Sequence, residues 1–185
     1  MSLFHKNTLL GASGAGGAAE ALYVDDVYST FLYEGNSSTQ TITNGIDLSG
    51  EGGMVWLKSR SNADTERGTQ KALISNTNND ESDATPFSGY GLTEFNSNGF
   101  TLGTSWIGEN NTSNDYVSWT FRKAPGFFDV VTFTLSSGTT NERISHNLGS
   151  TPGFIITKKT NANSSWACYH RSLGRGQYPQ LQSSN

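Results

Sequence analysis

Two stretches of the sequence that lie one hundred residues apart follow the same pattern. Residues 48–58 align without a gap with residues 148–158, and both stretches carry leucine, glycine and lysine at the same three positions. A repeat at a near-fixed spacing usually means that one structural unit has been copied in tandem. The alternative is coincidence among common residue types. The sequence therefore predicts two related units, each of about 100 residues.

The alignment extends beyond this stretch when small gaps are allowed. The further matches are Tyr33 with Phe133, Leu73 with Leu173, and Asn62-Ala63 with Asn161-Ala162. The copies differ in extent, because the second one ends before it reaches equivalents of Phe100–Leu102 and Tyr116–Phe121. A half-sandwich exposes an apolar face and an open strand edge. We therefore expect that the natural chain continues past Asn185, or that other subunits cover these surfaces.

Runs of β-forming residues alternate with turn signals along most of the chain. The clearest runs are Ser29–Tyr33, Gly53–Lys58, Phe100–Leu102, Tyr116–Arg122, Val130–Leu135 and Gly153–Lys158. The chain has 21 glycines, and serine, threonine and asparagine crowd the spaces between the runs, as is typical of short strands joined by tight turns. No helix longer than two turns is indicated. We expect an all-β fold made of tandem β-sandwich repeats, jelly-roll-like or lectin-like, with an extended N-terminal arm.

The same patterns divide the chain into three parts. Residues 1–22 form the N-terminal arm, which ends in a Gly/Ala-rich tether. Residues 23–125 form the first β-sandwich repeat, and residues 126–185 form the second, incomplete β repeat.

Charge and cysteine content exclude several classes of function. The net charge is −4 and the basic residues are scattered, so we expect no nucleic-acid partner. With one cysteine, Cys168, the chain has no internal disulfide and no zinc site of cysteine type. No apolar run approaches the ~20 residues of a membrane span, so we expect no membrane insertion. No signal-peptide core is visible, so we expect no secretion by that route.

The motifs that suggest chemistry have simpler interpretations. Tyr23–Asp26 spells a polymerase-like Tyr-Val-Asp-Asp string, but no third carboxylate motif or basic template groove accompanies it. Gly14–Gly17 has neither a preceding buried strand nor a following helix, so it indicates a tether and not a phosphate loop. Cys168 and His170 share one face of a predicted strand, where a buried free cysteine is the common case. We predict no catalytic residue, no metal site and no cofactor.

The tryptophans are the remaining candidates for ligand binding. Trp56 and Trp119 fall in predicted strands, which favours a place in the core. Trp106 lies beside Gly103 and Gly108, in a predicted loop, where an indole ring can stack on a sugar. Trp106 is therefore the better candidate for a ligand-binding residue, with a host surface glycan as the candidate ligand, while packing within the fold is the favoured interpretation of this ring.

Longer strings of residues resemble a family of proteins from marine bacteriophages. The strings are Tyr23–Thr30, Leu32–Asn36, Asn44–Leu48, Gly53–Lys58, Asn96–Gly103, Tyr116–Lys123, Phe128–Val131, His146–Ser150 and Tyr169–Leu173. Members of this family are described as tail fibres, or as structural proteins with a domain of unknown function. The resemblance covers Tyr23 to Leu173 and departs from the family at Gly174–Asn185. It implies a virion component that is made in the host cytoplasm.

The leading hypothesis is accordingly a tail fibre or tail-tip component. Its N-terminal arm would anchor it to other virion proteins, such as the tail hub, adaptor, nozzle or capsid. Phage fibres are commonly trimers, so we expect a homotrimer. The alternatives are a capsid fibre or decoration protein and a carbohydrate-binding, lectin-like module for host recognition. An enzyme such as a depolymerase would need paired carboxylates across a groove, for which the candidates are Asp25, Asp26, Glu94 and Glu109.

Overall fold

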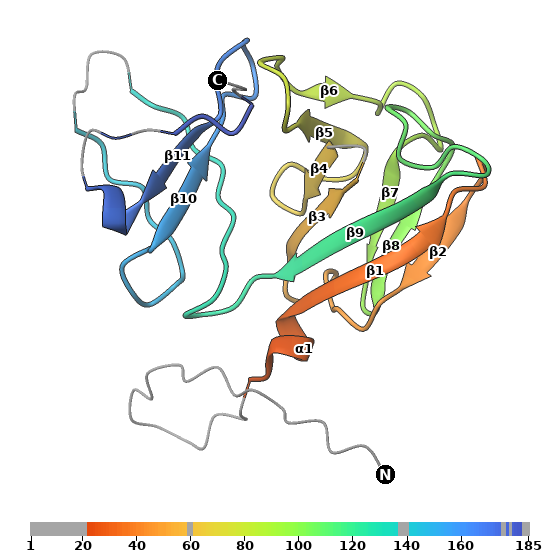
Figure 1. Ribbon diagram of the computed structural model, residues 1–185, viewed down its shortest axis with the longest axis horizontal. Coiled ribbons are helices and arrows are strands. Elements are labelled where there is room, and N and C mark those ends of the chain that lie inside the picture. The colour runs from red at the N-terminus through yellow and green to blue at the C-terminus, as the bar shows by residue number, and fades with distance from the viewer. Residues whose placement is uncertain (1–21, 59–60, 137–140, 175–176, 178, 183–185) are drawn as a thin grey trace.

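The structure is a computed structural model, and its described residues are almost entirely β (Figure 1). They are residues 22–58, 61–136, 141–174, 177 and 179–182. The strands are β1 (Tyr28–Glu34), β2 (Gln40–Thr43), β3 (Gly53–Leu57), β4 (Ser61–Asp64), β5 (Lys71–Ile74), β6 (Ser82–Asp83), β7 (Leu92–Asn96), β8 (Gly99–Leu102), β9 (Asp115–Arg122), β10 (Phe154–Thr157) and β11 (Ala167–His170). The two helical segments are the short helix α1 (Val24–Val27) and a 3-10 turn (Arg171–Leu173). The expectation of an all-β fold is confirmed.

Two antiparallel sheets form the larger part of the molecule. One has six strands in the order β1-β9-β3-β4-β5-β6, and the other has three strands in the order β2-β8-β7. In Figure 1 the three-stranded sheet lies behind β1 and β9. Strand β9 is central, because its Trp119 pairs with Thr30 on β1 and with Trp56 on β3. The predicted N-terminal arm, residues 1–22, lies outside the described residues apart from Leu22 and stays a prediction.

The hydrophobic core lies between these two sheets. Its buried members are Tyr33, Ile42, Ile46, Leu48, Val55, Leu57, Ala63, Leu92, Phe100, Leu102 and Tyr116. Both sheets contribute, with Val55 from β3 and the fully buried Phe100 from β8 as examples. Because strand side chains alternate between faces, β3 sends Val55 and Leu57 into this core while the residue between them faces away. No helix among the described residues has the length and hydropathy of a membrane span.

The prediction that Trp56 and Trp119 lie in the core was wrong. Val55 and Leu57 flank Trp56 and point into the core, so Trp56 points to the outer face of the sheet. Its ring meets that of Trp119 edge-on at a centroid distance of 6.3 Å, and both side chains are half-buried. The residues of β9 that face inward beside Trp119 are small, which lets the two sheets approach closely.

The hairpin of β10 and β11 packs against the turn that follows β5. The indole nitrogen of Trp166 donates to the carbonyl oxygens of Ile74 at 3.1 Å and Thr77 at 3.2 Å. The backbone nitrogen of Ser164 donates to the carbonyl oxygen of Asn78 at 2.8 Å. In Figure 1 the hairpin accordingly stands beside β5 and β6.

The two predicted repeats can be compared strand by strand. The matched segments that begin at Gly53 and Gly153 both lead into a strand, β3 and β10, and each strand is followed by an antiparallel partner. Beyond that strand the copies differ, because Leu73 is buried on β5 whereas Leu173 is 49% exposed in the 3-10 turn. The division into tandem units therefore stays a prediction.

The strand predicted at Val130–Leu135 does not form. The corresponding segment of the first unit, β1, pairs with β9 along its whole length. No described strand pairs with Val130–Leu135. A strand needs a neighbour to satisfy its backbone groups, so high β propensity alone leaves this segment without regular structure.

Candidate functional site

Trp106, the predicted ligand residue, lies in the loop between β8 and β9 and contacts two further aromatic rings. Phe87 and Tyr90 come from the loop between β6 and β7. The ring centroids are 5.0 Å apart for Phe87 and Trp106, and 5.9 Å apart for Tyr90 and Trp106. Phe87 and Tyr90 meet edge-on at 6.3 Å. We call these three residues the aromatic triad.

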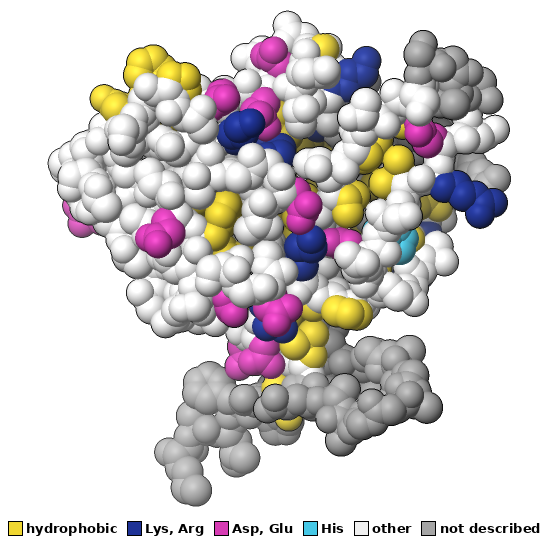
Figure 2. Space-filling model, turned by 180° about the vertical axis from the view of Figure 1, so that it is seen from behind, with side chains coloured by type: hydrophobic (Ala, Val, Ile, Leu, Met, Phe, Trp, Pro, Cys, Tyr) yellow, Lys and Arg dark blue, Asp and Glu magenta, His cyan; other side chains and the backbone are white. Residues whose placement is uncertain are grey.

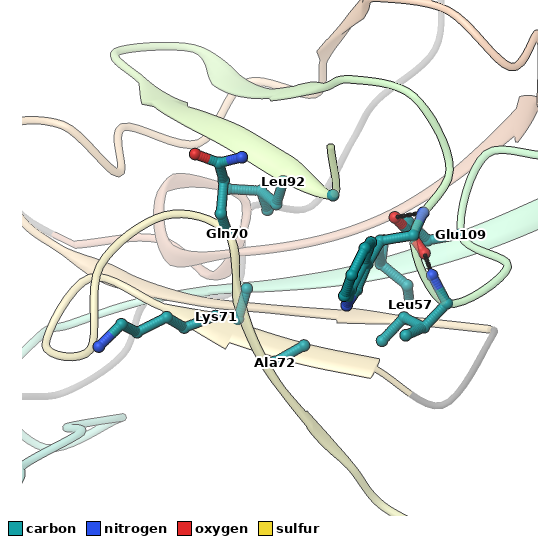
Figure 3. A pocket seen from close by; sticks show the side chains of 10 residues that line it. Leu57, Gln70, Lys71, Ala72, Leu92 and Glu109 are labelled. Carbon is teal, nitrogen blue, oxygen red and sulfur yellow. Dashed lines mark hydrogen bonds between the residues drawn. The ribbon is translucent and has the colours of Figure 1, made fainter. Parts of the chain in front are cut away.

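A recess borders the triad (Figure 3). It is lined by Leu57, Ala63, Gln70, Lys71, Ala72, Gly91, Leu92, Trp106, Ile107 and Glu109. Its free space admits little more than a water molecule, so the recess is too narrow to enclose a sugar ring. Contact with a ligand therefore falls to the exposed surface of the rings, and above all to Phe87, which is 51% exposed.

Glu109 holds the loop that carries Trp106. Its carboxylate accepts hydrogen bonds from the backbone nitrogens of Trp106 at 2.8 Å and Ile107 at 2.7 Å, drawn as dashed lines in Figure 3. Its carbonyl oxygen accepts a hydrogen bond from the hydroxyl of Tyr33 at 2.7 Å. The residue is 2% exposed, so both carboxylate oxygens serve the loop and not a substrate.

The other candidate carboxylates lie on separate elements. Asp25 and Asp26 are exposed on α1, and Glu94 is exposed on β7. Among the residues that the structure describes, no three His, Cys, Asp or Glu side chains form a group that could hold a metal ion. Glu109, the candidate acid that lies beside Trp106, accepts hydrogen bonds from backbone nitrogens with both of its carboxylate oxygens.

Gln70 holds the loop that carries the other two rings. Its side-chain nitrogen donates to the carbonyl oxygens of Phe87 at 2.9 Å and Tyr90 at 3.1 Å, and reaches that of Ala84 at 3.4 Å. Its own backbone nitrogen donates to the carbonyl oxygen of Leu92 at 2.7 Å. The side chain thus contacts three points of one loop from the turn that precedes β5.

Glycines bring the two loops together. Thr104 donates its backbone N–H to the carbonyl oxygen of Gly89 at 2.7 Å, and Gly103 donates to that of Gly91 at 2.8 Å. A Cβ atom on Gly103 would overlap the carbonyl oxygen of Gly89. Only glycine permits so close an approach of two backbones, so these positions set the distance between the rings.

Asn110 connects the same loop to the far end of β1, and sequence reasoning missed it. Its side-chain nitrogen donates to the carbonyl oxygens of Ser38 and Gly103, each at 2.7 Å. Its side-chain oxygen accepts from the backbone nitrogen of Asn36 at 3.0 Å and from the side chain of Gln40 at 2.7 Å. The residue is completely buried. The only signal in the sequence is a Gly-Glu-Asn-Asn run, which reads as an ordinary turn.

Comparison with known families places the whole described β structure in one group. The family model of a domain of unknown function, DUF7483, matches residues 24–185. The chain belongs to the DUF7483 family. The match begins at α1 and spans both the two-layer part and the β10–β11 hairpin. No curated protein and no solved structure matches the chain.

The thiol of the DUF7483 domain is buried in its second part. Cys168 lies on β11 with 6% exposure, and burial raises the pKa of its thiol, although a backbone hydrogen bond from Leu181 lowers it in part. The ring nitrogen Nδ1 of His170 accepts the backbone N–H of Ser172 at 3.3 Å and so caps the 3-10 turn. A nucleophilic cysteine needs a lowered pKa and access to solvent. This pair has the features of a structural thiol and a helix cap.

Exposed apolar side chains concentrate in the same part of the DUF7483 domain. Among the described residues, three large apolar side chains before residue 126 are exposed, namely Val24, Leu32 and Phe87. Eight lie after it: Val131, Phe133, Leu135, Ile144, Phe154, Ile155, Leu173 and Leu181. We call these eight the C-terminal apolar residues. Figure 2 shows hydrophobic side chains reaching the surface among scattered charges. Contiguous exposed apolar patches are typical of surfaces that contact other proteins, whereas single exposed apolar residues are common on any protein.

The buried hydroxyl of Tyr33 makes the stability of the DUF7483 domain depend on pH in the alkaline range. Burial, and then the charge of Glu109 and the neighbouring Tyr116, raise the pKa of Tyr33 above its usual range. The unfolded chain therefore releases this proton first, and the stabilisation is complete below about pH 10 and falls as the pH rises further. We expect Tyr33→Phe to flatten this alkaline loss in urea unfolding measured from pH 8 to 11. An unchanged slope would contradict the assignment.

Proposed function

We propose that this DUF7483 chain is a structural component of a bacteriophage virion, a tail fibre or tail-tip component that works as part of an oligomer. The observation that carries the proposal is the set of C-terminal apolar residues, with Leu135 62% and Phe154 55% exposed. Burial of such side chains contributes roughly 25 cal/mol for each Å² removed from water, which favours association with other subunits. A homotrimer buries the same residues in each of its subunits.

The finer organisation of the fold belongs to the same proposal. Residues 23–125 form a first β-sandwich unit, and residues 126–185 form a second, incomplete unit of the same jelly-roll-like or lectin-like type. In the first unit β9 pairs with both β1 and β3. The corresponding segments of the second unit are Val130–Leu135 and β10, and β10 pairs with β11 alone among the described strands. A strand supplied within the assembly would complete the second sheet.

The proposed position of the subunit in the virion rests on its N-terminal segment. The N-terminal arm, residues 1–22, anchors the subunit to another virion protein, a tail hub, adaptor, nozzle or capsid protein. A capsid fibre or decoration protein is the alternative within the same class. Imaging of labelled virions separates the two, since label on the tail supports a tail fibre and label on the head shell overturns it in favour of the capsid alternative. Absence of the protein from purified virions contradicts both.

Assembly through the C-terminal apolar residues can be tested in solution. We expect the purified chain to have about three times the mass of one subunit by light scattering, and Phe133→Ser with Leu135→Ser to shift it towards the monomer. Leu32→Ser is the matched control, because Leu32 is 76% exposed on β1, outside this set. A wild-type monomer contradicts the assembly. So does a double variant that associates as well as the Leu32 control.

A further inference from the structure

Phe87 is an unusual feature of the two-layer part of the molecule. It is one of three large apolar side chains before residue 126 that are exposed among the described residues. Unlike the other two, Val24 and Leu32, it lies in a cluster of aromatic rings, at 5.0 Å from Trp106. The ring therefore presents an exposed aromatic surface that rests on a second ring.

The triad is held rigidly before any ligand arrives. Gln70 bonds to the carbonyl oxygens of Phe87 and Tyr90, and Glu109 bonds to the backbone nitrogen of Trp106. Gln70 and Glu109 both bond to backbone atoms. They therefore hold the two loops that carry the rings. A site that is ordered in advance loses little conformational entropy on binding.

The two loops that carry the triad have hydroxyls and no charged side chain. Residues 84–91 read Ala-Thr-Pro-Phe-Ser-Gly-Tyr-Gly, and residues 103–108 read Gly-Thr-Ser-Trp-Ile-Gly. Three ionisable residues lie beside these loops: Lys71 pairs with Glu81 at 3.7 Å, Glu109 is buried, and the exposed Asp83 accepts the backbone N–H of Thr85 at 2.8 Å. A neutral ligand with many hydroxyls suits these loops, whereas a charged ligand finds no counter-charge on them.

Aromatic rings recognise one feature of sugars in particular. The face of an aromatic ring is negative, so it attracts the polarised C–H groups that line one side of a pyranose. A protein partner needs about 800 Å² of surface on each side, far more than one half-exposed ring provides. The narrow recess beside Trp106 leaves the exposed rings as the contact surface.

We propose that the aromatic triad binds a neutral pyranose unit of a host-surface polysaccharide, which stacks on the exposed ring of Phe87 while Trp106 packs behind that ring. This names the ligand for attachment and so rests on the proposed function for its biological setting. The contact itself depends only on the triad. Tyr90 packs against both other rings and holds them in place.

The test measures binding of neutral saccharides to the full chain. A glycan array selects the saccharide, and titration calorimetry then compares the wild type with variants. We expect Phe87→Ala and Trp106→Ala to weaken binding about tenfold and Phe87→Tyr to retain it. Phe87→Ala is the decisive variant, because a half-exposed loop residue can be removed with little effect on folding. Thermal unfolding confirms that each variant is folded.

The control is Leu32→Ala on β1. Leu32 is a large apolar side chain that is 76% exposed and belongs neither to the triad nor to the C-terminal apolar residues. Binding that falls equally in both variants overturns the proposal, as does an array that shows no neutral saccharide or only anionic ones.

Light scattering on Phe87→Ala separates this proposal from the assembly. An unchanged mass with lost binding supports the sugar site, whereas a reduced mass assigns the triad to a subunit contact and overturns it. Absent binding with an intact trimer overturns the sugar site alone.

Discussion

Asn110→Ala is expected to lower the free energy of unfolding by about 4 kcal/mol. The side chain is completely buried and makes hydrogen bonds to four residues. Three of them, Asn36, Ser38 and Gln40, lie about 70 residues earlier in the chain, and the fourth is Gly103 in its own loop. Each buried group left without a partner costs about 1–3 kcal/mol, and water that enters the space left by the side chain recovers part of the sum. Urea unfolding followed by tryptophan fluorescence measures the loss as a lower midpoint at an unchanged slope.

The adjacent Asn111 provides the control. Its side chain is exposed, so Asn111→Ala is expected to change the free energy of unfolding by less than about 0.5 kcal/mol. Asn110→Asp is a second probe, since it turns the carboxylate towards the carbonyl oxygens of Ser38 and Gly103, which now accept from the amide. It is expected to destabilise the fold as well. If Asn110→Ala unfolds at the same urea concentration as Asn111→Ala, the side chain does not hold the loops.

Strands with a regular alternation of large and small residues could be predicted from the sequence. Tyr116–Arg122 became β9 because its period of two matches the geometry of a strand with one face in the core, and the apolar run Gly53–Lys58 became β3. The alternation did not say which face is inside. In both strands the tryptophan points outward and the smaller residues point inward, a choice set by how closely the second sheet packs.

Strands with polar sequences could not be predicted in this way. Ser61–Asp64 forms β4, with Asn62 and Asp64 buried although both are polar. The Asp64 carboxylate pairs with Arg67, which lies beyond the strand, and the side-chain nitrogen of Asn62 donates to the carbonyl oxygen of Leu73 on the next strand. The reverse error occurred at Val130–Leu135, where residues of high β propensity have no described strand beside them. Whether a segment forms a strand depends in both cases on pairing with another segment, which the local sequence pattern does not reveal.

The candidate site shows the same division. Trp106 stood out in the sequence because it is an aromatic residue among glycines in a predicted loop. Phe87 and Tyr90 belong to another loop and reach it through the β7–β8 hairpin, so no local motif joins them. The residues that fix the rings, Gln70 and Glu109, are ordinary polar residues in sequence, and only their buried backbone partners reveal their role.

Arg67→Met is expected to cost about 3–5 kcal/mol in the free energy of unfolding. The guanidinium donates to Asp64 at 2.6 Å and to Glu81 at 3.1 Å, and all three side chains are mostly buried, at 7%, 6% and 16% exposure. Methionine fills a similar volume but leaves the buried Asp64 carboxylate without its cation and leaves Glu81 with Lys71 alone, at 3.7 Å. The same change should loosen the β10–β11 hairpin, because the backbone nitrogen of Glu81 donates to the carbonyl oxygen of Thr160 at 2.8 Å.

Two comparisons separate charge from packing in this network. Glu66→Gln removes a more exposed pair, in which the glutamate side chain is 33% exposed and contacts Lys123 at 2.7 Å while Lys123 keeps its pair with Asp129, so it should cost about 1 kcal/mol or less. The variant that combines Arg67→Met with Asp64→Leu and Glu81→Leu removes the three buried charges and leaves the more exposed Lys71. It should recover much of the loss, since an apolar replacement of a whole buried network is often neutral. A combined variant less stable than Arg67→Met alone would contradict this, and would show that the hydrogen bond from the backbone nitrogen of Arg67 to the Asp64 carboxylate, at 3.0 Å, contributes more than the pairing of charges.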